Sequence, residues 1–147
     1  MLMKIGITTG TGQLGAAILL QMIERIERSD IVAIARSPHK LSHTNIESRK
    51  GDYDRLDELI AAFQGLDAVM FVSGNTPPEI RLRQHLNVVE AAVIADVKKV
   101  VFSGILVDGY AAGFRAVQDV SLATERALIN SGLQWANGRN GIYLDPD

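Results

Sequence analysis

The sequence predicts an α/β fold with a doubly wound parallel sheet, within a single domain at residues 1–147. Three observations support this prediction. Short β-branched segments alternate with helix-periodic segments along the whole chain, which is typical of α/β proteins. The segment Ile31–Ala35 is apolar at every position, as expected for a strand covered on both faces. A glycine-rich turn joins the first predicted strand to the first helix, and ligands of such sheets bind at loops of this kind.

The first part of the chain predicts two buried strands, a helix between them and a short edge strand. Residues 3–8 predict a buried strand, and residues 13–28 predict a helix because apolar side chains recur at every fourth position. These side chains are Leu14, Ile18, Met22 and Ile26. The strand at residues 31–35 leads into a polar loop at 36–44. Residues 45–49 are expected to form a short edge strand.

The remaining elements alternate in the same way. We expect helices at residues 54–64, 79–96 and 117–130, and strands at 67–72, 99–102 and 133–136. Gly65 stops the first of these helices, and Ser131-Gly132 ends the last. Loops at residues 73–78 and 103–113 follow two strands, and these loops therefore belong to the ligand-binding edge of the sheet.

Composition limits the functions to consider. With 47% hydrophobic and 22% charged residues, the chain has the composition of an ordinary globular domain. A net charge of −2 gives no general attraction to nucleic acid or to an anionic membrane. The absence of cysteine excludes disulfides and thiol catalysis. No apolar run is long enough to span a bilayer and no signal peptide is visible, so we expect a cytoplasmic protein.

The glycine-rich turn has the spacing Gly10-x-Gly12-x-x-Gly15 used by dinucleotide-binding folds. Gly10 is expected to allow a tight turn, Gly12 to let the backbone approach a pyrophosphate, and Gly15 to bring the helix close to the sheet. The phosphates would then lie at the positive end of the helix dipole. The alternative is a glycine-rich turn without a ligand.

The loop after the second strand is predicted to meet the adenosine ribose. An acidic residue there would favour NAD(H), but this chain has Arg36 and, close by, Lys40. A guanidinium offers a planar set of donors suited to a 2′-phosphate, so NADP(H) is preferred over NAD(H). The alternative is a solvated basic loop.

Two further loops are candidates for cofactor contact. Asp52 is expected to accept a hydrogen bond from the adenine amino group, and Tyr53 to cover an edge of the ring; equally, Asp52 caps the helix that follows. Ser73 and Gly74 follow the next strand, where backbone must pass close to the nicotinamide half of the cofactor, although a plain turn uses the same residues.

One residue is a candidate for catalysis. Ser103 ends a strand, and its hydroxyl is placed to bond a substrate carbonyl, although a turn-forming role is the more common one. The three histidines, His39, His43 and His85, have no ligand-like spacing with carboxylates and are interpreted as surface or loop residues. No metal site is expected.

Together these residues resemble the NmrA-like branch of the atypical short-chain dehydrogenase/reductases, in particular bacterial NAD(P)H quinone oxidoreductases, often labelled nucleoside-diphosphate-sugar epimerases. The likeness keeps its order along residues 3–144 and is carried by Thr11-Gly-Gln-Leu-Gly15, Gly51-Asp-Tyr53 and the segments at 31–40, 62–67, 87–92 and 139–143. It implies an NAD(P)-binding Rossmann fold. The cofactor-binding residues it implies, with those named above, are Thr8, Gly10, Thr11, Gly12, Gln13, Leu14, Gly15, Arg36, Lys40, Asp52, Tyr53, Ser73 and Gly74.

The chain departs from this family's pattern in several places. Thr9 stands where the family has its first glycine, and a β-branched residue tolerates positive φ poorly. No Tyr-x-x-x-Lys pair exists, since Tyr110 is followed four residues later by Phe114, which argues against a working sugar epimerase. The segment at 134–139 lacks the apolar run of a sixth buried strand. The resemblance also implies that the family's last strand and small C-terminal substrate lobe are missing from this chain, which reaches only Asp147.

The resemblance implies hydride transfer from NADPH to a quinone or a similar small carbonyl acceptor. The alternatives are a non-catalytic sensor of the NADP redox state and a fragment that binds no cofactor. A sheet that ends early leaves an edge and apolar surface uncovered, so we also expect self-association into a homo-oligomer.

Overall fold

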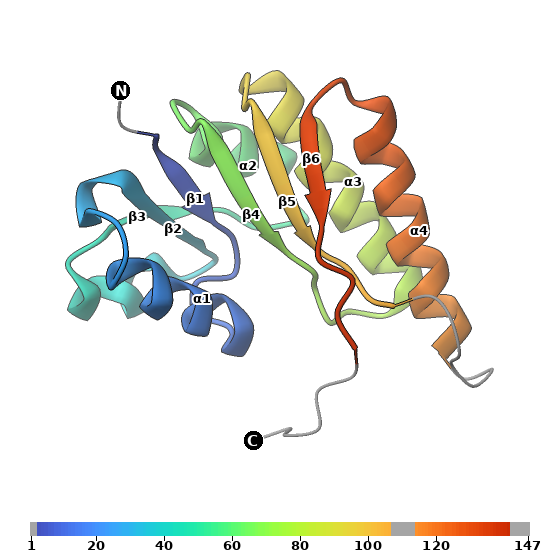
Figure 1. Ribbon diagram of the computed structural model, residues 1–147, viewed down its shortest axis with the longest axis horizontal. Coiled ribbons are helices and arrows are strands. Elements are labelled where there is room, and N and C mark those ends of the chain that lie inside the picture. Colours follow the sequence, from blue (N-terminus) through green and yellow to red (C-terminus); the bar gives the residue numbers. More distant parts are fainter. Residues whose placement is uncertain (1–2, 107–113, 142–147) are drawn as a thin grey trace.

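The computed structural model describes residues 3–106 and 114–141. Its strands form a parallel sheet in the order β3-β2-β1-β4-β5-β6 (Figure 1). The strands are β1 (Ile5–Ile7), β2 (Ile31–Ala35), β3 (Glu47–Lys50), β4 (Ala68–Val72), β5 (Lys99–Ser103) and β6 (Gln134–Asn137). The chain order reverses at β1, with β2 on one side of it and β4 on the other. This is a doubly wound Rossmann sheet, and it confirms the predicted fold class.

Helices cover both faces of the sheet (Figure 1). On one face α2 (Leu56–Phe63), α3 (Pro78–Ile94) and α4 (Arg115–Asn130) pack side by side. On the other face α1 (Gln13–Ile23) lies against β1 and β2, and the 3-10 turns η1 (Arg28–Asp30) and η2 (Pro38–Thr44) flank β2.

The alternation of side chains along the strands divides the core between these two layers. Val69 and Phe71 of β4 belong to the cluster under α2, α3 and α4, whereas Met70 packs against the cluster under α1. Phe71 and Phe102 lie together at the centre of the larger cluster, with ring centroids 4.9 Å apart. The layer of α2, α3 and α4 therefore holds β4 and β5 in place through this cluster, and with them the loops that follow these strands.

The first helix is shorter than predicted. The spacing of apolar residues suggested a helix to residue 28, but α1 ends at Ile23. Ile26 is 36% exposed, and its N–H bonds back to the Met22 carbonyl within a turn. Among the described residues, no core surface lies under residues 24–28, so apolar side chains on a helix there would have nothing to pack against. Gly65 and Gly132 end α2 and α4 with positive φ, as predicted.

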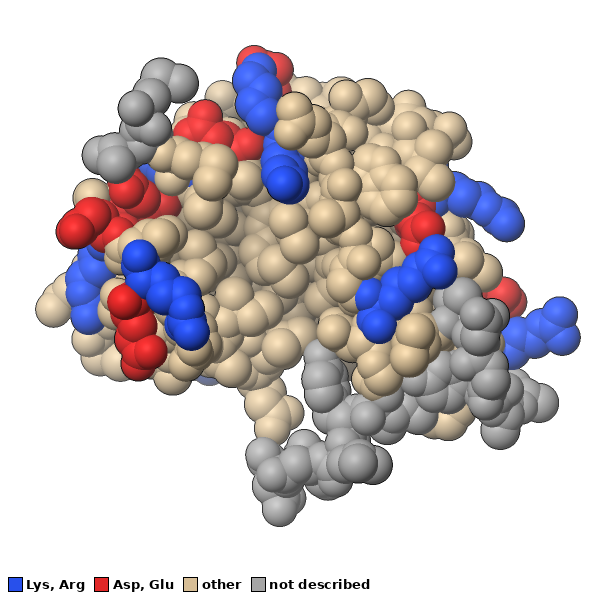
Figure 2. Space-filling model, in the orientation of Figure 1, with Lys and Arg blue, Asp and Glu red and all other residues tan. Residues whose placement is uncertain are grey.

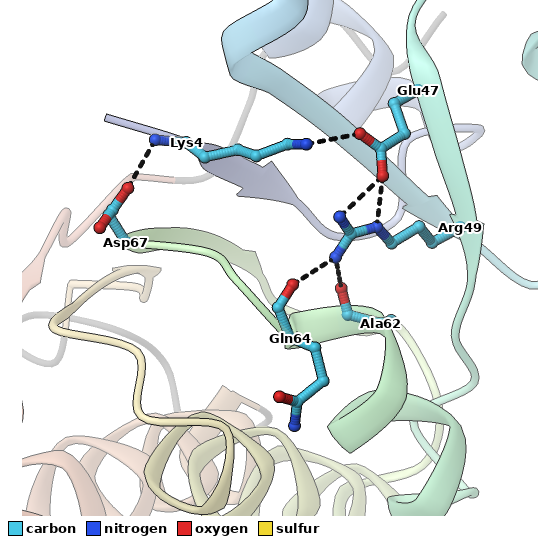
Figure 3. A network of polar contacts seen from close by, with 6 residues as sticks. All are labelled: Lys4, Glu47, Arg49, Ala62, Gln64 and Asp67. Atoms are coloured by element: carbon cyan, nitrogen blue, oxygen red, sulfur yellow. Dashed lines mark hydrogen bonds and ion pairs between the residues drawn. The ribbon is translucent and has the colours of Figure 1, made fainter. Parts of the chain in front are cut away.

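The amino edge of the sheet is closed by a polar network (Figure 3). Lys4 pairs with Glu47 at 2.6 Å, and Arg49 also binds this carboxylate. The Arg49 guanidinium donates to the carbonyls of Ala62 and Gln64, at the C-terminal end of α2, where a cation is favourable. The two cations and their hydrogen bonds hold the pKa of the Glu47 carboxyl below its usual value. The network thus ties β1, β3 and α2 together away from the ligand-binding edge.

The sheet is less covered around β6 and on one face of β4, β5 and β6. β6 forms at its exposed edge, and Trp135 remains 38% exposed, which explains why its sequence lacks an apolar run. Among the described residues, no helix covers β4, β5 and β6 on the face occupied elsewhere by α1 (Figure 1). Figure 2 shows that the middle of this face carries few charged side chains. Self-association through it stays a prediction, to be checked by light scattering.

Within residues 3–106 and 114–141, the helices are too short or too polar to cross a membrane. Tyr110, which bears on the missing Tyr-x-x-x-Lys pair, lies outside the described residues, as does most of the predicted loop at 103–113.

Candidate functional site

A cleft of about 400 Å³ opens at the carboxyl edge of the sheet, where the loops after β1, β2, β3 and β4 converge. This is the switch point of the strand order, where ligands bind in doubly wound sheets, and the volume suits a small organic ligand. Its lining consists of Thr9, Thr11, Gly12, Gln13, Leu14, Ala35, Arg36, Gly51, Asp52, Tyr53, Val72, Ser73, Gly74, Asn75, Thr76 and Gln84.

Most of the residues predicted to bind a cofactor line this cleft. Those brought together there are Thr11, Gly12, Gln13, Leu14, Arg36, Asp52, Tyr53, Ser73 and Gly74. Outside the lining are Thr8, Gly10, Gly15, Lys40 and the candidate catalytic Ser103. Sequence reasoning did not single out Gln84, which reaches the cleft from α3 and accepts a hydrogen bond from the Thr76 hydroxyl at 2.8 Å.

The turn after β1 differs from the prediction in one respect. Its left-handed residue is Thr9, with φ of 53°, and Gly10 does not take positive φ. Gly15 is required for a different reason: a Cβ there would lie 2.1 Å from the Thr9 carbonyl oxygen. A Cβ on Gly12 would lie 3.2 Å from the same oxygen, so Gly12 is the less crowded of the two. The glycines therefore let α1 pack on a strained threonine turn.

The N-terminus of α1 faces the cleft without a cap of its own. Gly12 provides no side-chain cap, and the first turn contains no acidic residue. Within the described residues no backbone oxygen accepts from the N–H groups of Gln13 or Leu14. Uncapped N–H groups and the positive end of the helix dipole favour an anion, so this part of the cleft fits the diphosphate of a dinucleotide.

Arg36 projects from the loop after β2 and is exposed. It makes no ion pair within residues 3–106 and 114–141, and the nearby Asp54 is paired with Arg83 at 2.8 Å. Arg83 first, and Arg36 to a smaller extent, lower the pKa of the Asp54 carboxyl. Lys40 lies on η2 and is also exposed, but it does not reach the cleft wall. Arg36 is thus the cation that the cleft offers at this end.

The loop after β3 contributes one polar and one structural residue. Asp52 accepts from the Asp54 N–H at 2.9 Å and also lines the cleft. It does not cap the following helix as the alternative above supposed, because α2 begins at Leu56 and its N-cap residue is Arg55. The Tyr53 hydroxyl donates to the Val72 carbonyl at 2.6 Å and contacts the Thr8 hydroxyl at 2.5 Å. Burial raises the pKa of the Tyr53 phenol above its ordinary value. Tyr53 therefore joins the ends of β1 and β4, and Thr8 is occupied in this joint.

The loop after β4 is held by side chains from two other elements. The Ser73 N–H donates to the Ser103 hydroxyl at 2.8 Å, and the Gly74 N–H donates to His85 Nε2 at 3.2 Å. Ser103 is only 6% exposed, so its hydroxyl supports the loop from behind.

The interpretation of His85 as a surface or loop residue is wrong, because it is 1% exposed on α3. It lies three and four positions before the buried Val88 and Val89, and this spacing places it on the inward face of the helix. Helical periodicity could have revealed its burial.

Within residues 3–106 and 114–141, no group of three or more His, Cys, Asp or Glu side chains is placed to hold a metal ion. The described lining of the cleft offers backbone N–H groups, hydroxyls, side-chain amides, the Asp52 carboxylate and the Arg36 guanidinium.

The strand order, the cleft at the switch point and the uncapped α1 together define a dinucleotide-binding domain. The chain belongs to the NAD(P)H-binding family, whose model matches residues 10–146. Membership in this family confirms the predicted class of cofactor.

Individual relatives extend this result. Quinone oxidoreductase 2 of Escherichia coli (strain K12) is 34% identical over 145 residues, covering 96% of this chain and 49% of the relative. An NmrA-like family domain-containing oxidoreductase of Aspergillus flavus is 36% identical over 150 residues, covering 97% and 49%. The crystal structure of Citrobacter sp. triphenylmethane reductase complexed with NADP(H) gives a TM-score of 0.90 at 32% identity, covering 97% of this chain and 50% of that one. The chain spans about half the length of the curated relatives it matches.

Proposed function

We propose that this domain binds NADPH in preference to NADH and serves hydride transfer to a quinone or a similar small carbonyl acceptor. When bound, the reduced nicotinamide supplies the hydride. The residues of this chain supply binding and orientation. The N–H groups at the start of α1 receive the diphosphate, and the wall at Ser73 and Gly74 receives the nicotinamide half.

The observation that carries the cofactor preference is the position of Arg36. It is the first residue after β2, lines the cleft, is exposed, and has no ion-pair partner in the described residues. A guanidinium in this position bonds a 2′-phosphate through paired, charge-assisted hydrogen bonds, and NADH offers no such group.

The acceptor is proposed from two considerations. The Escherichia coli relative is a quinone oxidoreductase, and reducing a quinone requires only a hydride and a proton available from water. The Ser103 hydroxyl is buried, accepts from the Ser73 N–H and lies outside the cleft lining, so it is not placed to give a proton to a ligand there. A reaction without a strong protein acid or base is consistent with these contacts.

Calorimetric titration with NADPH and NADH tests the cofactor preference. We expect NADPH to bind more tightly than NADH, and Arg36→Ala to weaken NADPH binding about tenfold to a hundredfold while leaving NADH unchanged. Arg25→Ala is the matched control, because Arg25 is exposed beyond the far end of α1 and bonds only Gln21. Equal affinities for the two cofactors, or no effect of Arg36→Ala, would contradict the preference.

A non-catalytic redox sensor is the second candidate. The internal bonding and burial of His85 and Ser103 suit such a sensor, and they equally allow the reduction of a quinone, so these contacts do not separate the two functions. Oxidation of NADPH with a simple benzoquinone separates the two functions. Turnover supports the reductase, and tight NADPH binding without turnover supports the sensor.

A further inference from the structure

His85 connects three elements behind the cleft wall. From α3 it reaches Gly74 in the loop after β4 and Thr124 on α4, with Nδ1 2.9 Å from the Thr124 hydroxyl. Its ring lies edge-on between Phe71 of β4 and Phe102 of β5, at centroid distances of 4.9 and 5.5 Å. A polar ring placed this deeply is costly unless each nitrogen has a partner, and here both do.

The contacts fix where the proton of the imidazole resides. The Gly74 N–H can only donate, so Nε2 must be the unprotonated acceptor. Nδ1 therefore carries the hydrogen and donates it to the Thr124 hydroxyl, which in turn donates to the Val120 carbonyl at 2.7 Å. In this series of hydrogen bonds, from the Gly74 N–H through His85 and Thr124 to the Val120 carbonyl, each hydrogen is donated to one acceptor. The arrangement thus requires a neutral ring in a single tautomer.

The surroundings keep the ring neutral. Burial first, and the positive charge of Arg81 second, lower the pKa of His85 to about 3. The groups facing it from β4, the loop after β4, β5 and α4 are Phe71, the Ser73 hydroxyl at 3.3 Å from Nε2, Phe102 and Thr124, and none of them is charged. Protonation would place an N–H against the Gly74 N–H.

The consequence appears on the cleft side. The N–H groups of Ser73 and Gly74 both point back to protein acceptors, the Ser103 hydroxyl and His85 Nε2. The wall they form therefore offers no backbone donor from these two residues to a ligand, and its position depends on two side chains outside the loop.

We propose that His85 is a positioning residue: its neutral imidazole holds the Ser73–Gly74 backbone in place for the nicotinamide half of the dinucleotide. The inference rests on the proposed function, since it assigns that half of the ligand to this wall. Its role is separate from that of Arg36, which acts on the adenosine half.

The test compares two ligands that share the adenosine half. NADPH contains both halves, whereas adenosine 2′,5′-bisphosphate lacks the nicotinamide. His85→Asn retains a donor near Thr124 but loses the acceptor for Gly74, and His85→Gln places an amide oxygen near the former Nε2. We expect His85→Asn to weaken NADPH about tenfold and the bisphosphate less than twofold, with His85→Gln restoring most of the NADPH affinity. Arg36→Ala should weaken both ligands.

Equal weakening of both ligands by His85→Asn, or unchanged NADPH affinity, would overturn the proposal. If the wild-type protein fails to bind NADPH, the proposed function fails instead. A second measurement needs no variant: ¹⁵N NMR of the wild-type imidazole should show a proton on Nδ1 and a bare Nε2, and NADPH but not the bisphosphate should shift the Gly74 amide. A proton on Nε2, or equal shifts from both ligands, would also overturn it.

Discussion

The loops after β1 and β4 lie at the same edge of the sheet, yet their backbones are used in opposite ways. In the first loop, the N–H groups of Gln13 and Leu14 have no backbone acceptor within the described residues. In the second, the N–H groups of Ser73 and Gly74 are taken by Ser103 and His85. One loop offers donors to an anion, and the other presents a wall whose donors are already satisfied.

This difference shows how each loop is specified. The first is local: three glycines and a helix start within a few residues create the uncapped donors that we propose bind the diphosphate. The second is assembled from distant parts of the chain, since Ser103 lies 30 residues and His85 11 residues from their partners. We therefore expect substitutions within the first loop to disturb that loop, and substitutions elsewhere in the chain to disturb the second loop.

The largest expected effect is that of a substitution at Gly15, compared with the same substitution at Gly12. Gly15→Ala puts a Cβ 2.1 Å from a backbone oxygen, so the turn or the helix must move. We expect the free energy of unfolding to fall by about 3 kcal/mol, despite the better helix propensity of alanine. Urea denaturation followed by circular dichroism measures this change.

Gly12→Ala is the matched variant. Its Cβ lies 3.2 Å from the same oxygen, and Gly12 has extended backbone angles open to alanine. We expect a change in stability of less than about 1 kcal/mol, together with weaker dinucleotide binding because the added methyl stands at the diphosphate approach. Equal destabilisation by both variants would show that the two glycines have the same structural role.

The fold was predictable because its signals are local and repeated. The all-apolar segment Ile31–Ala35 is β2 with the same bounds, and the glycine turn leads directly into α1. The end of α1 was not predictable from periodicity, because whether Ile26 finds a core surface depends on the packing of the whole sheet. β6 was predicted from a weak pattern of apolar residues. The pattern is weak because an edge strand needs few apolar residues.

Only part of the candidate site was predictable from the sequence. Residues next to strand ends, such as Gly12 and Arg36, line the cleft as expected. Gln84 and His85 were missed because their contribution depends on how α3 lies against the loop after β4, and chain order does not give this. Tyr53 was predicted to cover an edge of the adenine ring, and this stays a prediction: Tyr53 lines the cleft, and its hydroxyl is bonded within the protein.

A smaller effect tests the connection between the two loops. Tyr53→Phe removes the hydroxyl that joins Thr8 at the end of β1 to Val72 at the end of β4. Two partly buried hydrogen bonds are lost and the Val72 carbonyl loses a donor, so we expect about 2 kcal/mol of destabilisation at neutral pH. Urea midpoints of the two proteins measure it.

The stability difference between wild type and Tyr53→Phe should depend on pH in a definite direction. The phenol has its pKa raised above the ordinary value of 10.0 in the folded state, so its contribution is complete below pH 10 and declines as pH rises further, when the unfolded chain ionises first. The stability difference between wild type and Tyr53→Phe should therefore narrow above pH 10. The other tyrosines remain in both proteins and cancel. A constant difference up to pH 11 would contradict the buried, bonded phenol.

The smallest expected effect concerns the strain within the first loop. Thr9 has φ of 53°, and its hydroxyl oxygen is buried without a partner within the described residues. Glycine relieves about 1–2 kcal/mol of left-handed strain and removes the unpaired hydroxyl, against about 0.5–1 kcal/mol of added chain entropy in the unfolded state. Thr9→Gly should therefore raise the free energy of unfolding by about 1 kcal/mol. Asn45→Gly is the control, because Asn45 has φ of 54° but is exposed and belongs to a residue type that tolerates this region. Equal gains from both substitutions would mean that the strain at Thr9 has no special cost. A loss of stability at Thr9 alone would mean that its methyl group packs the turn against α1, so that the first loop, like the second, depends on a side chain.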